Sequence, residues 1–261
     1  MPSQDKQTLC FYGDSHLGCV KHAIDDGVRG ADDYDIEFWG SFGPDFRKLR
    51  LTDGAIVPDK DAEDSVDLIN GKGRKLLRPD DFDIIVFHAC RVRAFNFMSE
   101  FLNIARSEDA HVSAAVRSAT LDAWLEGIRS FRIAREFAKA KKARIYFTSV
   151  PFLTDGIGSD PLAGKAAAET ADKQDRAALW AELGSKFENA GIRFLAQPER
   201  TITRGCMTKS EYGVPTAVEL NDNAHKNAAY GALVVRQVFA AIAEDKAGKD
   251  ASADADLQSA A

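Results

Sequence analysis

The chain has 261 residues, of which 45% are hydrophobic and 28% are charged, and its formal net charge is −6. This length suits a single α/β domain with a sizeable core, and the composition is that of an ordinary globular protein. The sequence contains no basic stripe for nucleic acid, no run near the roughly 18 apolar residues of a membrane span, and no secretory signal. We therefore expect a cytoplasmic protein that binds neither nucleic acid nor a membrane.

Short apolar runs alternate with amphipathic stretches along the chain. The runs that predict strands are 8–12, 35–39, 83–87, 143–150 and 192–196. Helical spacing covers 15–29, 62–69, 94–105, 112–140, 166–190 and 223–243, and a hairpin is expected near 51–57. Such alternation predicts an α/β fold, a three-layer α/β/α sandwich whose central sheet is mostly parallel.

The last segment of the chain differs in composition from the rest. Residues 246–261 are small or charged and contain almost no aliphatic side chains. Such a segment cannot bury enough apolar surface to offset the entropy lost on ordering. We therefore expect one domain over residues 1–245, followed by a disordered tail over residues 246–261.

The first helical turn carries a candidate nucleophile. Ser15 follows the apolar run 8–12 directly and opens the predicted helix 15–29. Ligands of open parallel sheets bind outside the carboxyl ends of the strands, where free helix N–H groups can stabilise an oxyanion. The alternative is that Ser15 is only a helix cap, which is the commoner role of a serine at this position.

A candidate acid–base pair lies near the other end of the chain. Asp222 precedes His225 by three residues, just before or at the start of the last predicted helix. A serine nucleophile needs a base, and the base needs a group that holds its tautomer, so this spacing suits the pair. Taken without Ser15, Asp222 could equally be a cap and His225 a surface residue.

Together, GDSH at 13–16 and DNAH at 222–225 resemble the nucleophile and acid–base blocks of the SGNH (GDSL-like) hydrolase superfamily, in its GDSH variant. The resemblance covers the chain from about Gln7 to Glu244. It implies a flavodoxin-like sheet, with Ser15 as nucleophile, Asp222 as acid and His225 as base. The GDSH variant is similar to the SGNH domains of carbohydrate O-acyltransferases and acyl esterases.

The resemblance also implies positions that would bind the oxyanion or the substrate. Gly40 follows the second strand and corresponds to the family's backbone N–H donor, although it could be an ordinary turn glycine. The family's GxND block is absent after the third strand, where the chain has FHACRVR at 87–93. Arg91 lies nearest the missing Asn, with His88 close by. Arg91 could donate to the oxyanion, grip an anionic group of the substrate, or be a solvated loop residue.

These residues predict an SGNH-type serine esterase that hydrolyses small acyl esters, including carbohydrate O-acetyl esters, through an acyl-enzyme. The expected partner is therefore a small-molecule or carbohydrate ester. Two alternatives stay open: a carbohydrate O-acetyltransferase that uses the same three residues, and a binding protein that retains the fold without catalysis because the GxND block is missing. No His/Cys/Asp cluster has metal-ligand spacing, so we expect neither a metal nor a cofactor.

Overall fold

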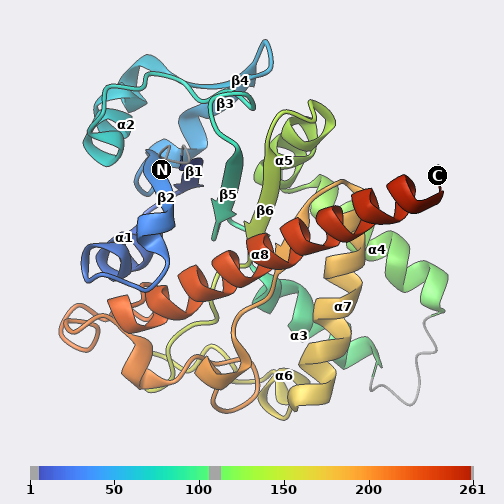
Figure 1. Cartoon of the computed structure of the whole chain (residues 1–261). Coiled ribbons are helices and arrows are strands. Elements are labelled where there is room, and N and C mark those ends of the chain that lie inside the picture. Colours follow the sequence, from blue (N-terminus) through green and yellow to red (C-terminus); the bar gives the residue numbers. More distant parts are fainter. Residues whose placement is uncertain (1–5, 106–112, 260–261) are drawn as a thin grey trace.

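Within residues 6–105 and 113–259, which the computed structural model describes, five parallel strands form the central sheet (Figure 1). These strands are β1 (Gln7–Gly13), β2 (Tyr34–Gly40), β5 (Ile84–His88), β6 (Arg144–Thr148) and β7 (Arg193–Leu195). Their spatial order is β2-β1-β5-β6-β7, which is the flavodoxin-like order. The chain leaves β1 for one edge and then crosses to the other side at β5. The ligand-binding crevice of such a sheet lies at this switch point, outside the carboxyl ends of β1 and β5.

Helices cover both faces of this sheet. Helices α1 (Leu17–Asp25) and α8 (Ala228–Ser259) contribute buried side chains to one core, together with Leu9 and Phe11 of β1. The helices with buried side chains in the other core are α2 (Glu63–Asn70), α3 (Ala94–Ala105), α4 (Ala114–Glu126), α5 (Arg129–Lys139), α6 (Ala166–Glu169) and α7 (Lys173–Asn189). The predicted three-layer α/β/α sandwich is therefore confirmed.

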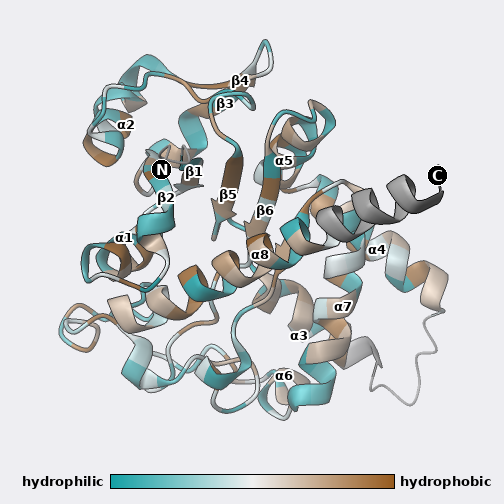
Figure 2. Ribbon diagram, in the orientation of Figure 1, coloured by the Kyte–Doolittle hydropathy of each residue, from teal (hydrophilic) through white to brown (hydrophobic). Residues whose placement is uncertain are grey.

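Strand β1 shows why its apolar run is continuous. Leu9 and Phe11 enter the core beneath α1 and α8, whereas Cys10 and Tyr12 enter the opposite core. Side chains of a strand alternate between faces, so a strand covered on both sides needs apolar residues at every position. Figure 2 shows the same hydrophobic character along β5 and β6. This pattern is what allowed the strands to be predicted.

The predicted hairpin is also present. It consists of β3 (Leu49–Thr52) and β4 (Ala55–Pro58), which pair antiparallel. The two residues between them, Asp53 and Gly54, have φ angles of 50° and 77°. Aspartate followed by glycine is the pair that adopts such left-handed angles most readily in a two-residue hairpin turn.

Two predicted helices are each divided in the structure. The helix expected over 112–140 is interrupted at residues 127–128, between α4 and α5. Gly127 favours this interruption because glycine has a low helix propensity. The helix expected over 166–190 is interrupted before Asp172. The Asp172 side chain accepts from the backbone of Asp175 and forms a capping box that starts α7.

The last helix also differs from its prediction at both ends. It begins at Ala228 rather than near residue 223, because the DNAH segment forms a loop. It continues to Ser259, through most of the segment for which composition predicted disorder. Alanines and interspersed opposite charges favour extension of a helix that is already formed. No helix in the described part of the chain combines the length and apolar character needed to cross a membrane.

Helices α1 and α8 approach each other so closely that one contact excludes any side chain. A Cβ atom on Gly231 of α8 would lie 1.9 Å from the carbonyl oxygen of Cys19 in α1. We expect Gly231→Ala to lower the free energy of unfolding by about 1–3 kcal/mol, because α1 and α8 must separate. Urea unfolding measures this change.

Gly184→Ala in α7 is the matched control. A Cβ atom at Gly184 would meet nothing within 4 Å. This substitution should raise the free energy of unfolding by about 0.5–1 kcal/mol, because alanine favours the helix. Equal destabilisation by both substitutions would contradict the close contact between α1 and α8.

Candidate active site

Ser15 lies in a tight turn between β1 and α1, at the switch point of the sheet. The backbone N–H of Leu17 donates to the carbonyl of Asp14 at 2.9 Å, and α1 starts at Leu17. The N-cap of α1 is His16, and it makes no side-chain cap bond. Ser15 Oγ instead forms a hydrogen bond with His225 Nε2 at 2.8 Å. The structure therefore does not use Ser15 as the helix cap, which was the alternative interpretation.

The loop before α8 orients His225. Asp222 Oδ1 accepts from the backbone N–H groups of Ala224 and His225, both at 3.1 Å. Asp222 Oδ2 lies 2.7 Å from His225 Nδ1. With the proton on Nδ1 donated to this carboxylate, Nε2 presents its lone pair to the Ser15 hydroxyl.

The charge of Asp222 suits this role. Partial burial would raise the pKa of its carboxyl, but hydrogen bonds from the backbone and the ring of His225 outweigh burial and lower the pKa overall. The carboxylate is therefore ionised at neutral pH. The three residues predicted as nucleophile, acid and base are thus brought together in the arrangement of a Ser–His–Asp triad.

Lys226 stabilises the same loop through hydrogen bonds of its buried side chain. Its side chain is buried, and Nζ donates to Thr154 Oγ1 at 2.9 Å, to the Asn223 carbonyl at 3.0 Å and to the Ala224 carbonyl at 2.8 Å. Three acceptors match the three N–H donors of an ammonium group. Burial lowers the pKa of Lys226 to about 7. Apart from its position next to His225, no feature of the sequence indicated this role for Lys226.

We expect Lys226→Met to weaken this loop and to remove one contribution to the pH dependence of stability. Below pH 7 Lys226 is protonated in both the folded and the unfolded chain. Between about pH 7 and its usual pKa of 10.5, only the unfolded chain keeps the proton, so rising pH favours the folded state. The wild type should therefore gain stability relative to Lys226→Met as the pH rises from 7 to 9.

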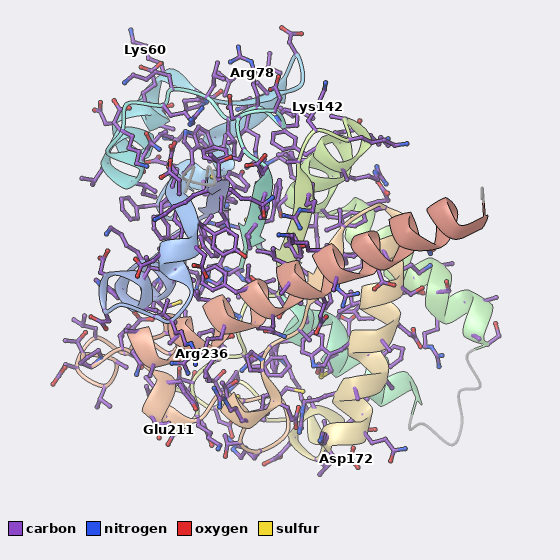
Figure 3. All side chains as sticks on the ribbon, viewed as in Figure 1. Lys60, Arg78, Lys142, Asp172, Glu211 and Arg236 are labelled. Carbon is purple, nitrogen blue, oxygen red and sulfur yellow. The ribbon has the colours of Figure 1, made fainter. Side chains whose placement is uncertain are left out.

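Urea unfolding at several pH values tests this expectation. Lys142→Met is the control, because Lys142 is exposed. Figure 3 shows it at the end of the molecule opposite Glu211, whose backbone carbonyl accepts from Asn227 next to Lys226. The stability difference between this control and the wild type should stay constant with pH. Parallel pH curves for the wild type and Lys226→Met would contradict the expectation.

Gly40 lies where three strand ends meet. Its φ is 155°, and a Cβ atom there would lie 1.8 Å from the carbonyl oxygen of Gly13. A Cβ atom on Gly13 would in turn lie 2.6 Å from the carbonyl oxygen of His88. Both glycines are therefore required for the close approach of β2, β1 and β5. The oxyanion-binding role of the Gly40 N–H group stays a prediction.

Arg91 contacts the loop at Gly43, Asp14 and Phe46. Its Nη2 donates to the Gly43 carbonyl at 2.6 Å, its Nε lies 3.4 Å from Asp14 Oδ2, and its guanidinium lies over the ring of Phe46. It does not line the hollow at Ser15. Arg91 thus contacts Asp14, which precedes Ser15, and its predicted role toward the oxyanion or the substrate stays a prediction. Its left-handed φ of 62° redirects the loop and could not be anticipated from residue type.

His88 is a core residue, and its burial does not fit the role at the substrate that the sequence predicted. It is only 1% exposed, and its Nδ1 lies 2.9 Å from Thr148 Oγ1. Burial lowers its pKa to about 3, so the ring stays neutral. His88 is the last residue of β5, and its side chain turns into the sheet core rather than into the crevice.

His16 is a residue whose orientation the sequence left open. Its ring centre lies 5.2 Å from that of His225. Burial, followed by the charges of His225, Lys226 and Arg93, lowers the pKa of His16 to about 3. The neutral His16 ring lines both a hollow of about 270 Å³ around Ser15 and His225 and a second hollow of about 260 Å³. It therefore faces the crevice.

Comparisons with known proteins give structural likenesses. No protein-family model and no curated protein matches the chain.

In the described residues no cluster of three or more His, Cys, Asp or Glu side chains could hold a metal ion.

Three solved structures resemble the chain. The periplasmic domain of a lipopolysaccharide acetyltransferase from Salmonella ser. Paratyphi A is 15% identical, with 92% of this chain and 85% of that one covered and a TM-score of 0.45. An extracellular lipase from Streptomyces rimosus is 12% identical, with 85% and 93% covered and a TM-score of 0.39. A carbohydrate esterase family 2 enzyme from Corynascus thermopiles is 14% identical, with 94% and 68% covered and a TM-score of 0.36. The resemblance to the SGNH superfamily itself stands on the two motifs and on the strand order of this chain.

Proposed function

We propose that this chain is an SGNH-type serine esterase that acts on small acyl esters, including O-acetyl esters of carbohydrates. One observation carries the proposal: Ser15 Oγ lies 2.8 Å from His225 Nε2, whose other ring nitrogen lies 2.7 Å from Asp222. A binding protein without catalysis would have no need for this triad. The triad makes covalent catalysis the better interpretation despite the missing GxND block.

Acylation begins when Ser15 Oγ attacks the ester carbonyl carbon and His225 Nε2 accepts the hydroxyl proton. The Ser15 and Gly40 N–H groups are the proposed donors to the oxyanion that forms. As this intermediate collapses, the carbon–oxygen bond to the alcohol breaks and Nε2–H gives its proton to the departing oxygen. Ser15 is left as an acyl ester.

Deacylation repeats the sequence with water. His225 Nε2 accepts a proton from a water molecule, whose oxygen attacks the acyl carbon. The second intermediate collapses, the proton passes from Nε2 to Ser15 Oγ, and the carboxylic acid leaves. Asp222 remains ionised throughout and stabilises the imidazolium of both steps. A sugar hydroxyl in place of water would give the O-acetyltransferase alternative with the same three residues.

A fluorophosphonate probe combined with short-chain esters tests the proposal. We expect one covalent adduct, on the peptide that contains Ser15, and release of acid from aryl acetates and acetylated sugars. Adding a sugar acceptor separates the two outcomes, because a transferase would release less acetate and form acetylated sugar. An unlabelled, natively folded chain that cleaves no ester would overturn the proposal.

A further inference from the structure

A second hollow adjoins the candidate active site. Its volume is about 260 Å³, and its walls come from the segments that follow β5 and β6. Phe95, Val150 and Leu153 give it apolar sides, whereas Arg93 supplies a guanidinium group. Apolar walls with one convergent charge are typical of a site for a small organic ligand.

The position of this hollow connects it with the reacting atoms. His16 lines both this hollow and the one around Ser15. Ala224 lines the second hollow and directly precedes His225. An ester whose carbonyl lies at Ser15 Oγ can therefore extend one of its two parts past His16. Both hollows lie outside the carboxyl ends of parallel strands, where this fold binds its ligands.

The charge of the hollow is one-sided. Arg93 is exposed, and in the described part of the chain no carboxylate forms an ion pair with it. None of the described residues that line the hollow is acidic. Arg204, in contrast, pairs with three carboxylates. Among the described residues, the hollow thus has a positive charge at Arg93 without a counter-ion.

We propose that this hollow binds a part of the substrate that has an apolar body of a few carbon atoms and ends in a carboxylate, with Arg93 as its specificity-determining residue. This inference rests on the proposed esterase function. The apolar walls would bind the carbon chain, and the guanidinium would bind the carboxylate through charge-assisted hydrogen bonds. The carboxylate can belong to either the acyl or the alcohol part of the ester, and both share this chemistry.

Two pairs of esters distinguish these sources. Mono-p-nitrophenyl adipate and p-nitrophenyl hexanoate differ by a carboxylate on the acyl part. 4-(Butyryloxy)benzoate and its methyl ester differ by a carboxylate on the alcohol part. We expect the wild type to prefer the anionic member of one pair, with spontaneous hydrolysis subtracted. In Arg93→Gln the ratio of the two kcat/KM values for that pair should fall roughly tenfold, and Arg93→Lys should restore part of it.

Arg78→Gln is the matched control. It removes the same charge at an exposed position before β5, whereas the hollow is lined by residues that follow β5 and β6. Figure 3 shows Arg78 at the end of the molecule opposite Glu211. The kcat/KM ratios in this control should equal those of the wild type. An equal fall in both variants would indicate a general charge effect and overturn the inference.

The inference and the proposed function fail in different ways. Fluorophosphonate labelling of Ser15 with unchanged ratios in Arg93→Gln, for both ester pairs, would overturn the inference alone. Absence of both labelling and turnover in the wild type would overturn the esterase proposal and this inference with it. Stronger competitive inhibition of hexanoate ester hydrolysis by adipate than by hexanoate, lost in Arg93→Gln, would support the inference independently of the substrate comparison.

Discussion

Replacing Ser15 with alanine is expected to lower the turnover of short-chain esters by roughly a thousand-fold or more and to abolish fluorophosphonate labelling. The reason is that Ser15 Oγ, 2.8 Å from His225 Nε2, is the atom that forms the acyl bond in the proposed reaction. The turn that holds Ser15 depends on backbone bonds, so the variant should fold normally. Steady-state kinetics and intact-mass analysis after labelling measure the two effects.

The control for this experiment is Ser159→Ala. Ser159 is exposed and lies outside the hollow around Ser15. The Ser159→Ala variant should be labelled at Ser15 and should turn over esters as the wild type does. If Ser15→Ala retained wild-type activity and labelling, Ser15 could not be the nucleophile, and the proposed acyl-enzyme would be wrong.

Replacing His225 with alanine should cause a loss of turnover comparable to that of Ser15→Ala, because the hydroxyl then has no base. The substitution also leaves a space next to Ser15 in which free imidazole can bind. Added imidazole should therefore restore part of the activity of His225→Ala, with a saturable dependence on its concentration. The same imidazole should not restore Ser15→Ala.

Asp222→Asn gives a graded comparison. The amide cannot compensate the imidazolium charge, but the base remains, so the loss should be roughly one to two orders of magnitude smaller than that in His225→Ala. Imidazole should not rescue this variant, because the ring position is already occupied. Equal and complete losses in all three variants, with no rescue, would indicate a structural collapse rather than removal of individual catalytic groups. Circular dichroism distinguishes these outcomes.

The fold was predictable from sequence because its strands are buried on both faces. In β1, Leu9 and Phe11 serve one core and Cys10 and Tyr12 the other, and the resulting apolar run is easily distinguished from amphipathic helices. Helix boundaries were less predictable. The break at Gly127 and the capping box at Asp172 are local signals that continuous apolar spacing obscured, because the periodicity runs on across both breaks.

The candidate site was predictable where the chemistry depends on residue type and spacing. Ser15, Asp222 and His225 lie together as the motifs implied. Arg91 and His88 were harder to assign, since their roles depend on side-chain direction. The left-handed backbone at Ala89 and Arg91 redirects the loop after β5, and a sequence carries no measure of that angle.

Lys226 and the hollow at Arg93 were not predictable at all. Lys226 contacts Thr154, which lies 72 residues away in sequence. The hollow combines segments after two different strands. Such contacts arise from the packing of distant loops, so only the three-dimensional structure reveals them.

The pairing of Ser15 with His225 has a consequence for how the protein becomes active in the cell. The two residues are separated by 210 positions, and they meet because α1 packs on α8 at the backbone contact of Cys19 with Gly231. During translation the hydroxyl is made long before the imidazole, so a partly synthesised chain carries the nucleophile without its base. Under the proposed function, esterase activity would therefore arise only after α8 has left the ribosome and docked on α1. A chain that ends before His225 would then be expected to show no esterase activity, and the onset of ester hydrolysis would report the docking of α8.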